Sequence, residues 1–351
     1  MWIETPVLKE DLDSVCSLDY IPWENLANKT IMITGATGLI GTSFVNALIY
    51  ADKNKKLNLK IYALVRNKER AEQIFQHQLK DSDVLSFIIG DVESIPDITE
   101  NIDYIIHAAS PTASSYFIEK PVETIKTAVL GTLNILELAK QKNIAGMVYL
   151  SSMEIYGSPK TEDSLKEENV GYIDPLVVRN CYPEAKRQCE SLCATYAAEY
   201  NIPVVSVRLA QTFGPGVEPN DSRVFAEFAR CVMNHTDIVL LTTGTSKRCY
   251  LYTMDAVSAI LTALLKGEPG KAYNAANQQT YCSIYEMAQE ICAKLGNNLI
   301  KVKIELNEKE SKKFSPPHFY NLDTTAIRHL GWIPTTDLMN MYERMIAAMQ
   351  L

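Results

Sequence analysis

Tyr182 and Lys186 stand four residues apart, a spacing that places both side chains on one face of a helix. A tyrosine in this position can take the proton of an alcohol, and the neighbouring ammonium would lower the pKa of its phenol. Oxidation of a secondary alcohol by hydride transfer needs such a base beside a nicotinamide. Ser152 ends a short apolar stretch and could hydrogen-bond the same substrate oxygen, so the three residues form a candidate catalytic set.

The spacing Tyr-x-x-x-Lys is a weak signal by itself, because it occurs three times in this chain. Tyr116 falls in a segment that we predict to be a loop. The stretch from Tyr156 to Lys160 contains Pro159, which disfavours a helix. Only Tyr182 opens a segment with a clear helical pattern, so we select it over the other two.

Three glycines, Gly35, Gly38 and Gly41, follow the apolar segment 30–34 and precede a predicted helix over 39–51. Between a strand and a helix, this GxxGxxG spacing predicts a dinucleotide site. The first glycine permits the tight turn, the second lets a pyrophosphate approach, and the third allows close packing. The helix N-terminus then presents unpaired N–H groups to the phosphates. Further cofactor contacts are expected from the same loop and from the ends of later strands: Thr37, Leu39, Ile40, Val92, Ala108, Ala109 and Ser110.

The choice between NAD and NADP depends on the residue that follows the second predicted strand. NAD sites usually place an acidic residue here for the ribose hydroxyl, whereas this chain has Arg66, which could pair with the 2′-phosphate of NADP. Asp91, after the third strand, could reach the adenine amino group or cap a turn. Both cofactors stay open, with Arg66 favouring NADP.

Predicted strands and helices alternate as far as residue 210. We expect strands at 30–34, 60–65, 84–89, 104–108, 146–151 and 204–209, and helices at 39–51, 68–78, 122–142 and 183–200. This alternation predicts an α/β fold with a doubly wound parallel (Rossmann) sheet. We assign 1–28 to an N-terminal extension, 29–210 to a dinucleotide-binding domain and 211–351 to a smaller substrate-binding domain, with 245–262 returning to the first domain.

The composition is that of a globular protein and argues against nucleic-acid and membrane roles. The net charge of −8 lacks the basic excess that nucleic-acid binding requires. No apolar run reaches the roughly 18 residues of a membrane span, and the N-terminus has no signal-peptide pattern. The eight cysteines form no CxxC pair and have no clustered histidines, so we expect free thiols, no metal site and a cytoplasmic location.

Four motifs together resemble the extended short-chain dehydrogenase/reductases, the group of the NAD-dependent sugar-nucleotide epimerases, dehydratases and decarboxylases. They are Gly35-Ala-Thr-Gly-Leu-Ile-Gly41, His107-Ala-Ala-Ser-Pro111, Ser151-Ser-Met-Glu-Ile-Tyr-Gly157 and Tyr182-Pro-Glu-Ala-Lys186. Within this group, the stretches 109–111, 180–187, 211–215, 221–224 and 244–248 are most similar to the UDP-glucuronate decarboxylases. The resemblance implies a sugar-nucleotide substrate and a homodimer.

The resemblance also implies individual roles. Ser152 would be the hydroxyl partner of the substrate, Tyr182 the base, Lys186 its modulator and Glu154 a carboxylate near C5 of the sugar. Substrate contacts would come from Ser110, Pro111, Gln211, Arg223 and Arg248, with Arg223 near the diphosphate and Arg248 as a substrate-binding cation. His107 is expected to pack at the end of its strand and not to react.

The residue after Ser152 helps to choose the reaction. Similar dehydratases carry an Asp–Glu pair here, in which the Asp is the acid that expels a hydroxyl, whereas this chain has Met153 before Glu154. Decarboxylation needs no such acid. Oxidation at C4 makes a β-keto acid, which loses carbon dioxide readily before the hydride is returned.

Several functions stay open at this point. The leading hypothesis is a redox-neutral decarboxylase, and an epimerase, a 4,6-dehydratase and an NADP-dependent keto-sugar reductase are the enzymatic alternatives. The chain departs from the decarboxylase pattern at Arg66, Ala128 and Gln211, where the group has an acidic residue and two asparagines. A dinucleotide-sensing scaffold protein is the alternative without catalysis, and the intact catalytic set argues against it.

Overall fold

The computed structural model describes residues 5–81, 83–306 and 317–350. Its centre is a parallel sheet of seven strands in the order β3-β2-β1-β4-β5-β6-β10. The strands are β1 (Thr30–Thr34), β2 (Lys60–Val65), β3 (Leu85–Ile89), β4 (Tyr104–His107), β5 (Gly146–Ser152), β6 (Val204–Leu209) and β10 (Ala272–Ala275). The doubly wound parallel sheet predicted from the alternation is confirmed.

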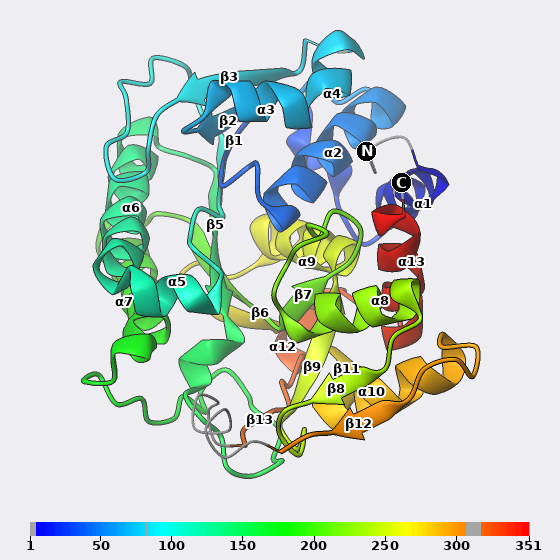
Figure 1. Cartoon of the computed structure of the whole chain (residues 1–351). Coiled ribbons are helices and arrows are strands. Elements are labelled where there is room, and N and C mark those ends of the chain that lie inside the picture. The colour runs from blue at the N-terminus through cyan, green and yellow to red at the C-terminus, as the bar shows by residue number, and fades with distance from the viewer. Residues whose placement is uncertain (1–4, 82, 307–316, 351) are drawn as a thin grey trace.

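Helices cover both faces of this sheet (Figure 1). On one face α6 (Pro121–Lys142) packs along α7 (Cys181–Tyr200), and on the other face α2 (Leu39–Lys55) packs along α9 (Thr253–Lys266). Strands enclosed on both faces need apolar side chains in both directions, and β1 is accordingly buried along its whole length. The sheet is therefore enclosed between two layers of helices.

The strand order reverses between β1 and β4. From β1 the chain winds outward to β2 and β3, and it then crosses back to build β4, β5 and β6 on the other side. In sheets of this kind, ligands bind outside the carboxyl ends of the strands at the point of reversal. The glycine loop after β1 and the loop after β4 both lie at this point.

The helix expected over 68–78 is the main local departure from the predicted pattern. It is divided at Phe75 into α3 (Lys68–Ile74) and α4 (Gln76–Asp81). Phe75 is fully buried, its ring centre lies 6.1 Å from that of Phe87 on β3, and its backbone has left the helical conformation. Burial of this one ring decides where the helix breaks.

The chain after β6 adds a smaller group of strands and helices around β9. β9 pairs with β11, β13 and β7, and β8 pairs with β12. These elements are β7 (Gln211–Phe213), α8 (Val224–Asn234), β8 (Ile238–Leu240), β9 (Lys247–Tyr252), β11 (Asn277–Ser283), α10 (Ile284–Lys294), β12 (Val302–Ile304), β13 (Phe319–Tyr320), α12 (Thr325–His329) and α13 (Leu338–Met349). Between them, α9 and β10 return to the main sheet. The domain boundary at residue 210 stays a prediction.

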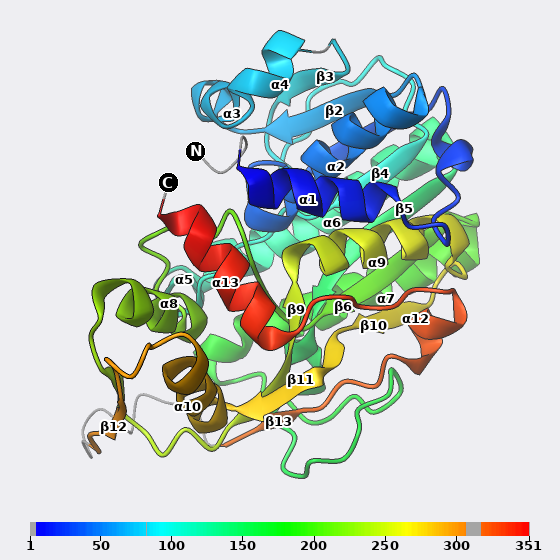
Figure 2. The ribbon, with the colours of Figure 1, turned by 90° about the vertical axis from the view of Figure 1, so that its right-hand side faces the viewer.

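Two short elements precede β1, namely α1 (Pro6–Cys16) and the 3₁₀ turn η2 (Trp23–Leu26). Figure 2 shows α1 lying across α2 and α9, beside α13. On α1, the buried Asp11 accepts hydrogen bonds from the hydroxyl of Tyr252 at 2.6 Å and from Nη2 of Arg344 at 2.7 Å. Arg344 belongs to α13, so one buried ion pair joins the two ends of the chain.

This ion pair generates a stability prediction. Burial raises the pKa of Asp11 to about 6, although Tyr252 and Arg344 both favour its ionised form. We expect Arg344→Met to lower the free energy of unfolding by about 3 kcal/mol near pH 7, because a buried carboxylate then has no cation. The loss should be smaller near pH 5, where Asp11 can take up a proton in the folded state.

Urea denaturation at the two pH values measures both effects. The double variant Asp11→Asn/Arg344→Met is the control and should recover part of the lost stability, because it removes the buried charge as well. Equal losses in the single and the double variant would show that the ion pair is not the cause.

Candidate active site

The predicted glycine loop joins β1 to α2 at the point of strand reversal. Gly35 has a φ of +66°, and a Cβ there would lie 2.7 Å from the backbone of Ala108. A Cβ on Gly41 would lie 2.2 Å from the carbonyl oxygen of Gly35. The packing of the protein itself therefore requires glycine at both positions.

Gly38 has a different reason to be glycine. A Cβ there would meet only the carbonyl oxygen of Gly35, at 3.4 Å, so the protein alone leaves room for it. Gly38 is also the N-cap of the 17-residue helix α2, and no side chain caps the first N–H groups of that helix. Exposed backbone at a positive helix end fits a pyrophosphate. The neighbouring residues Thr37, Leu39 and Ile40 are partly exposed around it.

Arg66 and Asp91 lie side by side after β2 and β3, with Nη1 and Oδ2 3.7 Å apart. The side chain of Arg66 is 78% exposed, so this ion pair holds the guanidinium only weakly and leaves it able to turn toward a ligand. Asp91 accepts a hydrogen bond from the backbone N–H of Glu93 at 3.0 Å and so caps a turn. Val92 packs tightly against Gly131 of α6. A Cβ added to Gly131 would lie 2.7 Å from Cγ2 of Val92.

The end of β4 is held in place by a buried histidine. His107 Nδ1 lies 2.7 Å from Thr34 Oγ1, and its Nε2 lies 3.1 Å from Thr132 Oγ1. Burial lowers the pKa of His107 to about 3, so the ring is neutral and joins β1 to α6. The expectation that it packs is confirmed. The predicted contacts of the following loop are half-buried: Ala108, Ala109, Ser110 and Pro111.

Ser152, Tyr182 and Lys186 converge at the carboxyl end of β5. Ser152 ends β5 and caps the 3₁₀ turn η3 (Met153–Tyr156), where its Oγ accepts a hydrogen bond from the N–H of Glu154 at 3.2 Å. Tyr182 lies in the first turn of α7, close enough to Ser152 for that side chain to lower the pKa of the phenol in part. Lys186 lies one turn later and donates from Nζ to the carbonyl oxygen of Leu150 at 2.7 Å. All three side chains are buried.

The electrostatics of this set differ from the expectation that Lys186 lowers the pKa of Tyr182. The pKa of Tyr182 is raised, first because the phenol is buried and then because Glu154 is close, and the charges that oppose this rise are those of Arg179 and Arg223. Burial lowers the pKa of Lys186 to about 8, and its Nζ lies 5.7 Å from the centre of the Tyr182 ring. The ammonium is directed at a backbone carbonyl and not at the phenol oxygen.

Glu154 is paired with a residue that the sequence motifs did not reveal. Arg179, in the 3₁₀ turn η4 (Val178–Asn180), donates two hydrogen bonds to the carboxylate, of which the one from Nη2 to Oε1 measures 3.2 Å. Arg179 lies three residues before Tyr182, in the short turn that leads directly into the helix of the tyrosine. That spacing was the one signal in the sequence that could have indicated it.

Phe117 covers the ring of the candidate base. The rings of Phe117 and Tyr182 stack with their centres 4.2 Å apart and their planes 8° apart, and the guanidinium of Arg179 lies 5.4 Å from the centre of Phe117. Phe117 belongs to α5 (Ser114–Glu119), which occupies the segment around Tyr116 that was predicted to be a loop. That prediction was wrong, because burial of Phe117 against α7 stabilises a helical turn that the local pattern does not indicate.

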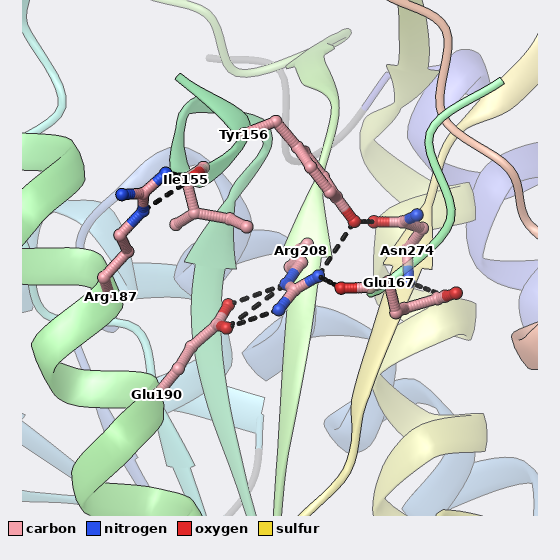
Figure 3. A network of polar contacts seen from close by, with 7 residues as sticks. All are labelled: Ile155, Tyr156, Glu167, Arg187, Glu190, Arg208 and Asn274. Carbon is pink, nitrogen blue, oxygen red and sulfur yellow. Dashed lines mark hydrogen bonds and ion pairs between the residues drawn. The ribbon is translucent and has the colours of Figure 1, made fainter. Parts of the chain in front are cut away.

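A network around Arg208 of β6 joins the elements that carry the catalytic set (Figure 3). Arg208 donates to both oxygens of Glu190 on α7, from Nε at 2.9 Å and from Nη2 at 2.7 Å. Its Nη1 donates to the hydroxyl of Tyr156 at 2.9 Å, and that hydroxyl donates to Oδ1 of Asn274 on β10 at 2.7 Å. A single buried guanidinium thus ties α7, η3 and β10 together.

Arg187 adds a second link between α7 and η3. Its Nε and Nη2 donate to the carbonyl oxygen of Ile155 at 2.9 and 2.6 Å (Figure 3). Tyr156 is buried within these contacts, and η3 ends before Gly157, so no helix extends to Lys160. Rejection of the Tyr156 pair as a catalytic set therefore agrees with its structural place.

The structure places two of the predicted substrate contacts, Arg223 and Gln211, in the chain that follows β6. Arg223 precedes α8 and donates from Nε to Oδ1 of Asp221 at 3.0 Å, and its charge lowers the pKa of Tyr182 in part. Gln211 begins β7 and is half-buried beside Tyr250 of β9. Arg223 is therefore close to Tyr182, and Gln211 lies beside β9.

Arg248 of β9 faces the same space from another direction. Its Nη2 lies 3.0 Å from Nε2 of His318, and its buried Nε has no hydrogen-bond partner within residues 5–81, 83–306 and 317–350. The charges of Arg248, Arg179 and Glu154 all act on the pKa of Tyr320, which places them around one ring. The site therefore gathers three arginines, an arrangement suited to an anionic ligand.

The eight cysteines are free thiols. Within the described part of the chain, no group of three or more His, Cys, Asp or Glu side chains is arranged to hold a metal ion. Over the same residues, none of the helices combines the length and the apolar character that crossing a bilayer requires.

Comparison with known proteins agrees with this geometry. The profile of the NAD dependent epimerase/dehydratase family matches residues 31–276. The chain belongs to this family. The matched region extends from β1 to the end of β10 and so includes the glycine loop, the catalytic set and the arginines near it.

Among its curated relatives are two proteins of Arabidopsis thaliana named UDP-glucuronic acid decarboxylase 5 and 6. They are 30% and 29% identical over 312 residues, which cover 89% of this chain and 86% of each relative. The solved structures similar to it include the dTDP-glucose 4,6-dehydratase DesIV of Streptomyces venezuelae, with NAD and TYD bound, at a TM-score of 0.74 and 20% identity over 92% of this chain and 97% of that one. A UDP-glucuronic acid 4-epimerase of Bacillus cereus has a TM-score of 0.72 at 20% identity, over 92% and 99%. At such identities the structures show the shared fold.

The two kinds of glycine in the loop lead to a binding prediction. We expect Gly38→Ala to fold with a stability within about 1 kcal/mol of the wild type, because its Cβ has room in the protein. NADH binding should weaken about tenfold or more, because that Cβ would stand where the pyrophosphate must approach. Fluorescence titration with NADH measures the affinity, and thermal unfolding measures the stability.

The matched control is Gly41→Ala, which should destabilise the fold itself by about 1 to 3 kcal/mol through its clash with Gly35. If Gly38→Ala bound NADH as tightly as the wild type, the pyrophosphate would not lie at this helix end.

Proposed function

We propose that this enzyme removes the C6 carboxyl group of UDP-glucuronate after transient oxidation of the sugar at C4. The observation that carries the proposal is the convergence of Ser152, Tyr182 and Lys186 beside Glu154. The relatives named UDP-glucuronic acid decarboxylase support the choice of substrate.

Met153 favours decarboxylation over loss of a hydroxyl group. This residue stands where similar dehydratases have an acid, and it is only 5% exposed, within the main hydrophobic core. An acid that expels a hydroxyl would have to lie at this position, and Met153 can neither donate a proton nor reach the substrate. A C4 epimerase would use the same catalytic set, so the nature of the product decides between the two.

Bound NAD would accept the hydride from C4 and return it within the same turnover. Tyr182 would take the proton of the C4 hydroxyl, which the hydroxyl of Ser152 would hold in position. Lys186 is protonated below a pH of about 8 and would balance the charge of the tyrosinate. When the bond between C5 and C6 breaks, carbon dioxide leaves, the electron pair passes to the C4 oxygen beside Tyr182 and Ser152, and C5 then takes a proton.

The remaining assignments follow the same geometry. The loop of Gly35, Gly38 and Gly41 would hold the pyrophosphate of the cofactor, and Arg223 and Arg248 would bind the anionic nucleotide. A homodimer through α6 and α7 is supported by exposed apolar side chains on α6, at Val122, Ile125 and Leu130. Sedimentation velocity of the purified chain tests that assembly.

The first prediction concerns the base. Purified protein incubated with UDP-glucuronate should release carbon dioxide, and mass spectrometry should show the matching loss from the sugar nucleotide. Tyr182→Phe should lower kcat by about 10²- to 10⁴-fold while UDP-glucuronate still binds, because the phenyl ring keeps the stack with Phe117 but cannot take a proton. Tyr116→Phe, at the rejected tyrosine, is the control and should leave kcat near that of the wild type.

The outcomes separate the alternatives. A product of unchanged mass but altered configuration would identify an epimerase. If UDP-glucuronate and other sugar nucleotides all remain unchanged, the protein would be a dinucleotide-binding scaffold and the proposal would be overturned.

The second prediction concerns the cofactor. The family is NAD dependent, and we propose that Arg66 also allows NADP to bind, because its exposed guanidinium can turn from Asp91 to a 2′-phosphate. Arg66→Asp should weaken NADP binding about 10- to 100-fold and leave NAD binding equal or stronger. Titration of both dinucleotides measures the ratio, with the exposed Arg328→Gln as the control for lost positive charge. An unchanged ratio would show that Arg66 does not select the cofactor.

A further inference from the structure

Glu154 and Arg179 form an ion pair beside the catalytic set, and the proposed reaction gives Arg179 no role. The two side chains are 22% and 30% exposed, so they are neither surface groups nor sealed in the core. Both charges act on the pKa of Tyr182 and on that of Tyr320. The pair therefore faces the space in which the sugar must lie when its C4 is beside Tyr182.

Arg179 is oriented by more than its carboxylate partner. Its guanidinium lies over Phe117, and Phe117 stacks on Tyr182, so the position of this cation is coupled to that of the candidate base. Glu154 takes one hydrogen bond from each terminal nitrogen of Arg179. Each of these nitrogens carries a second N–H, and the described residues provide no acceptor for it. An oriented guanidinium with remaining donors is suited to a second carboxylate.

The charge of Glu154 makes such a cation necessary for an acidic sugar. Glu154 would lie near C5, so a sugar with a carboxylate on C5 would bring a second negative charge against it. Like charges in a partly enclosed site repel more strongly than in water. A sugar with a neutral hydroxymethyl group meets no such repulsion. Of the cations in the site, Arg179 is the one bonded to Glu154 itself.

We propose that Arg179 determines specificity by binding the C6 carboxylate of a nucleotide-linked uronic acid, and that Glu154 weakens this contact by competing for the same guanidinium. The inference rests on the proposed function. Glu154 keeps part of the hydrogen bonding of Arg179, so the carboxylate of the substrate is recognised without being held as tightly as in an isolated ion pair. That balance suits a group that must leave as carbon dioxide.

The two residues must then have opposite effects on binding, which a purely structural role would not produce. The measurement is isothermal titration of NAD-loaded protein with UDP-glucuronate and with UDP-glucose, in the Tyr182→Phe background so that neither ligand is converted. Arg179→Gln should weaken UDP-glucuronate binding about 10- to 100-fold and UDP-glucose binding less than about threefold. Glu154→Gln should strengthen UDP-glucuronate binding relative to UDP-glucose binding, because the guanidinium of Arg179 then no longer pairs with a carboxylate of the protein.

Two further variants keep the test decisive. Arg328→Gln removes an exposed cation on α12 and should leave the ratio of the two affinities unchanged. Arg179→Lys keeps the charge without the planar pair of donors and should keep a smaller preference for UDP-glucuronate, which covers the case that Arg179→Gln does not fold. The inference is overturned if Arg179→Gln keeps the wild-type ratio, or if the two substitutions shift the ratio in the same direction.

Failure of this inference is distinguishable from failure of the proposed function. Suppose that the wild-type protein releases carbon dioxide from UDP-glucuronate, but that Arg179→Gln does not change the ratio of the affinities for UDP-glucuronate and UDP-glucose. Only the inference is then wrong. If the wild-type protein releases none and binds UDP-glucose as tightly as UDP-glucuronate, both are wrong.

Discussion

The buried ion pair between Arg208 and Glu190 is the interaction on which the geometry of the site most depends. A charge removed from water is tolerated only when its hydrogen bonds are satisfied, so each partner of Arg208 is held in a defined place. These partners lie on the helix that carries Tyr182 and Lys186 and on the turn that carries Glu154. The relative positions of Tyr182 and Glu154 are thus fixed by Arg208 and its partners.

The front of the site is electrostatically incomplete without its ligands. Burial raises the pKa of Tyr182 and lowers that of Lys186, so the protein alone does not favour a tyrosinate. Three arginines surround this region, each beside an acidic residue or a histidine. An anionic ligand in this region would add negative charge beside these arginines and so change that balance.

The glycine loop shows how one motif combines two constraints. Gly35 and Gly41 are needed for the backbone of β1, the loop after β4 and α2 to approach one another. Gly38 is free of such contacts and leaves the helix end open to a phosphate. The spacing of the three is regular in the sequence, yet only two of them are required by the fold.

The sequence alone determined the features that depend on near neighbours. The alternation of apolar segments predicted six strands and the parallel sheet, the glycine spacing predicted the turn into α2, and the four-residue interval between Tyr182 and Lys186 placed both on one helix face. Each of these follows from the geometry of a single strand, turn or helix, which a local pattern encodes.

Tertiary structure alone decided the contacts between distant segments. Arg179 reaches Glu154 across 25 positions of sequence. Phe117 stacks on Tyr182 from α5, and the ring of Phe75, where α3 ends, packs near Phe87 of β3. The seventh strand of the sheet comes from beyond residue 270. No local pattern encodes such contacts, because they exist only once the packing of the sheet and its helices has fixed which surfaces meet.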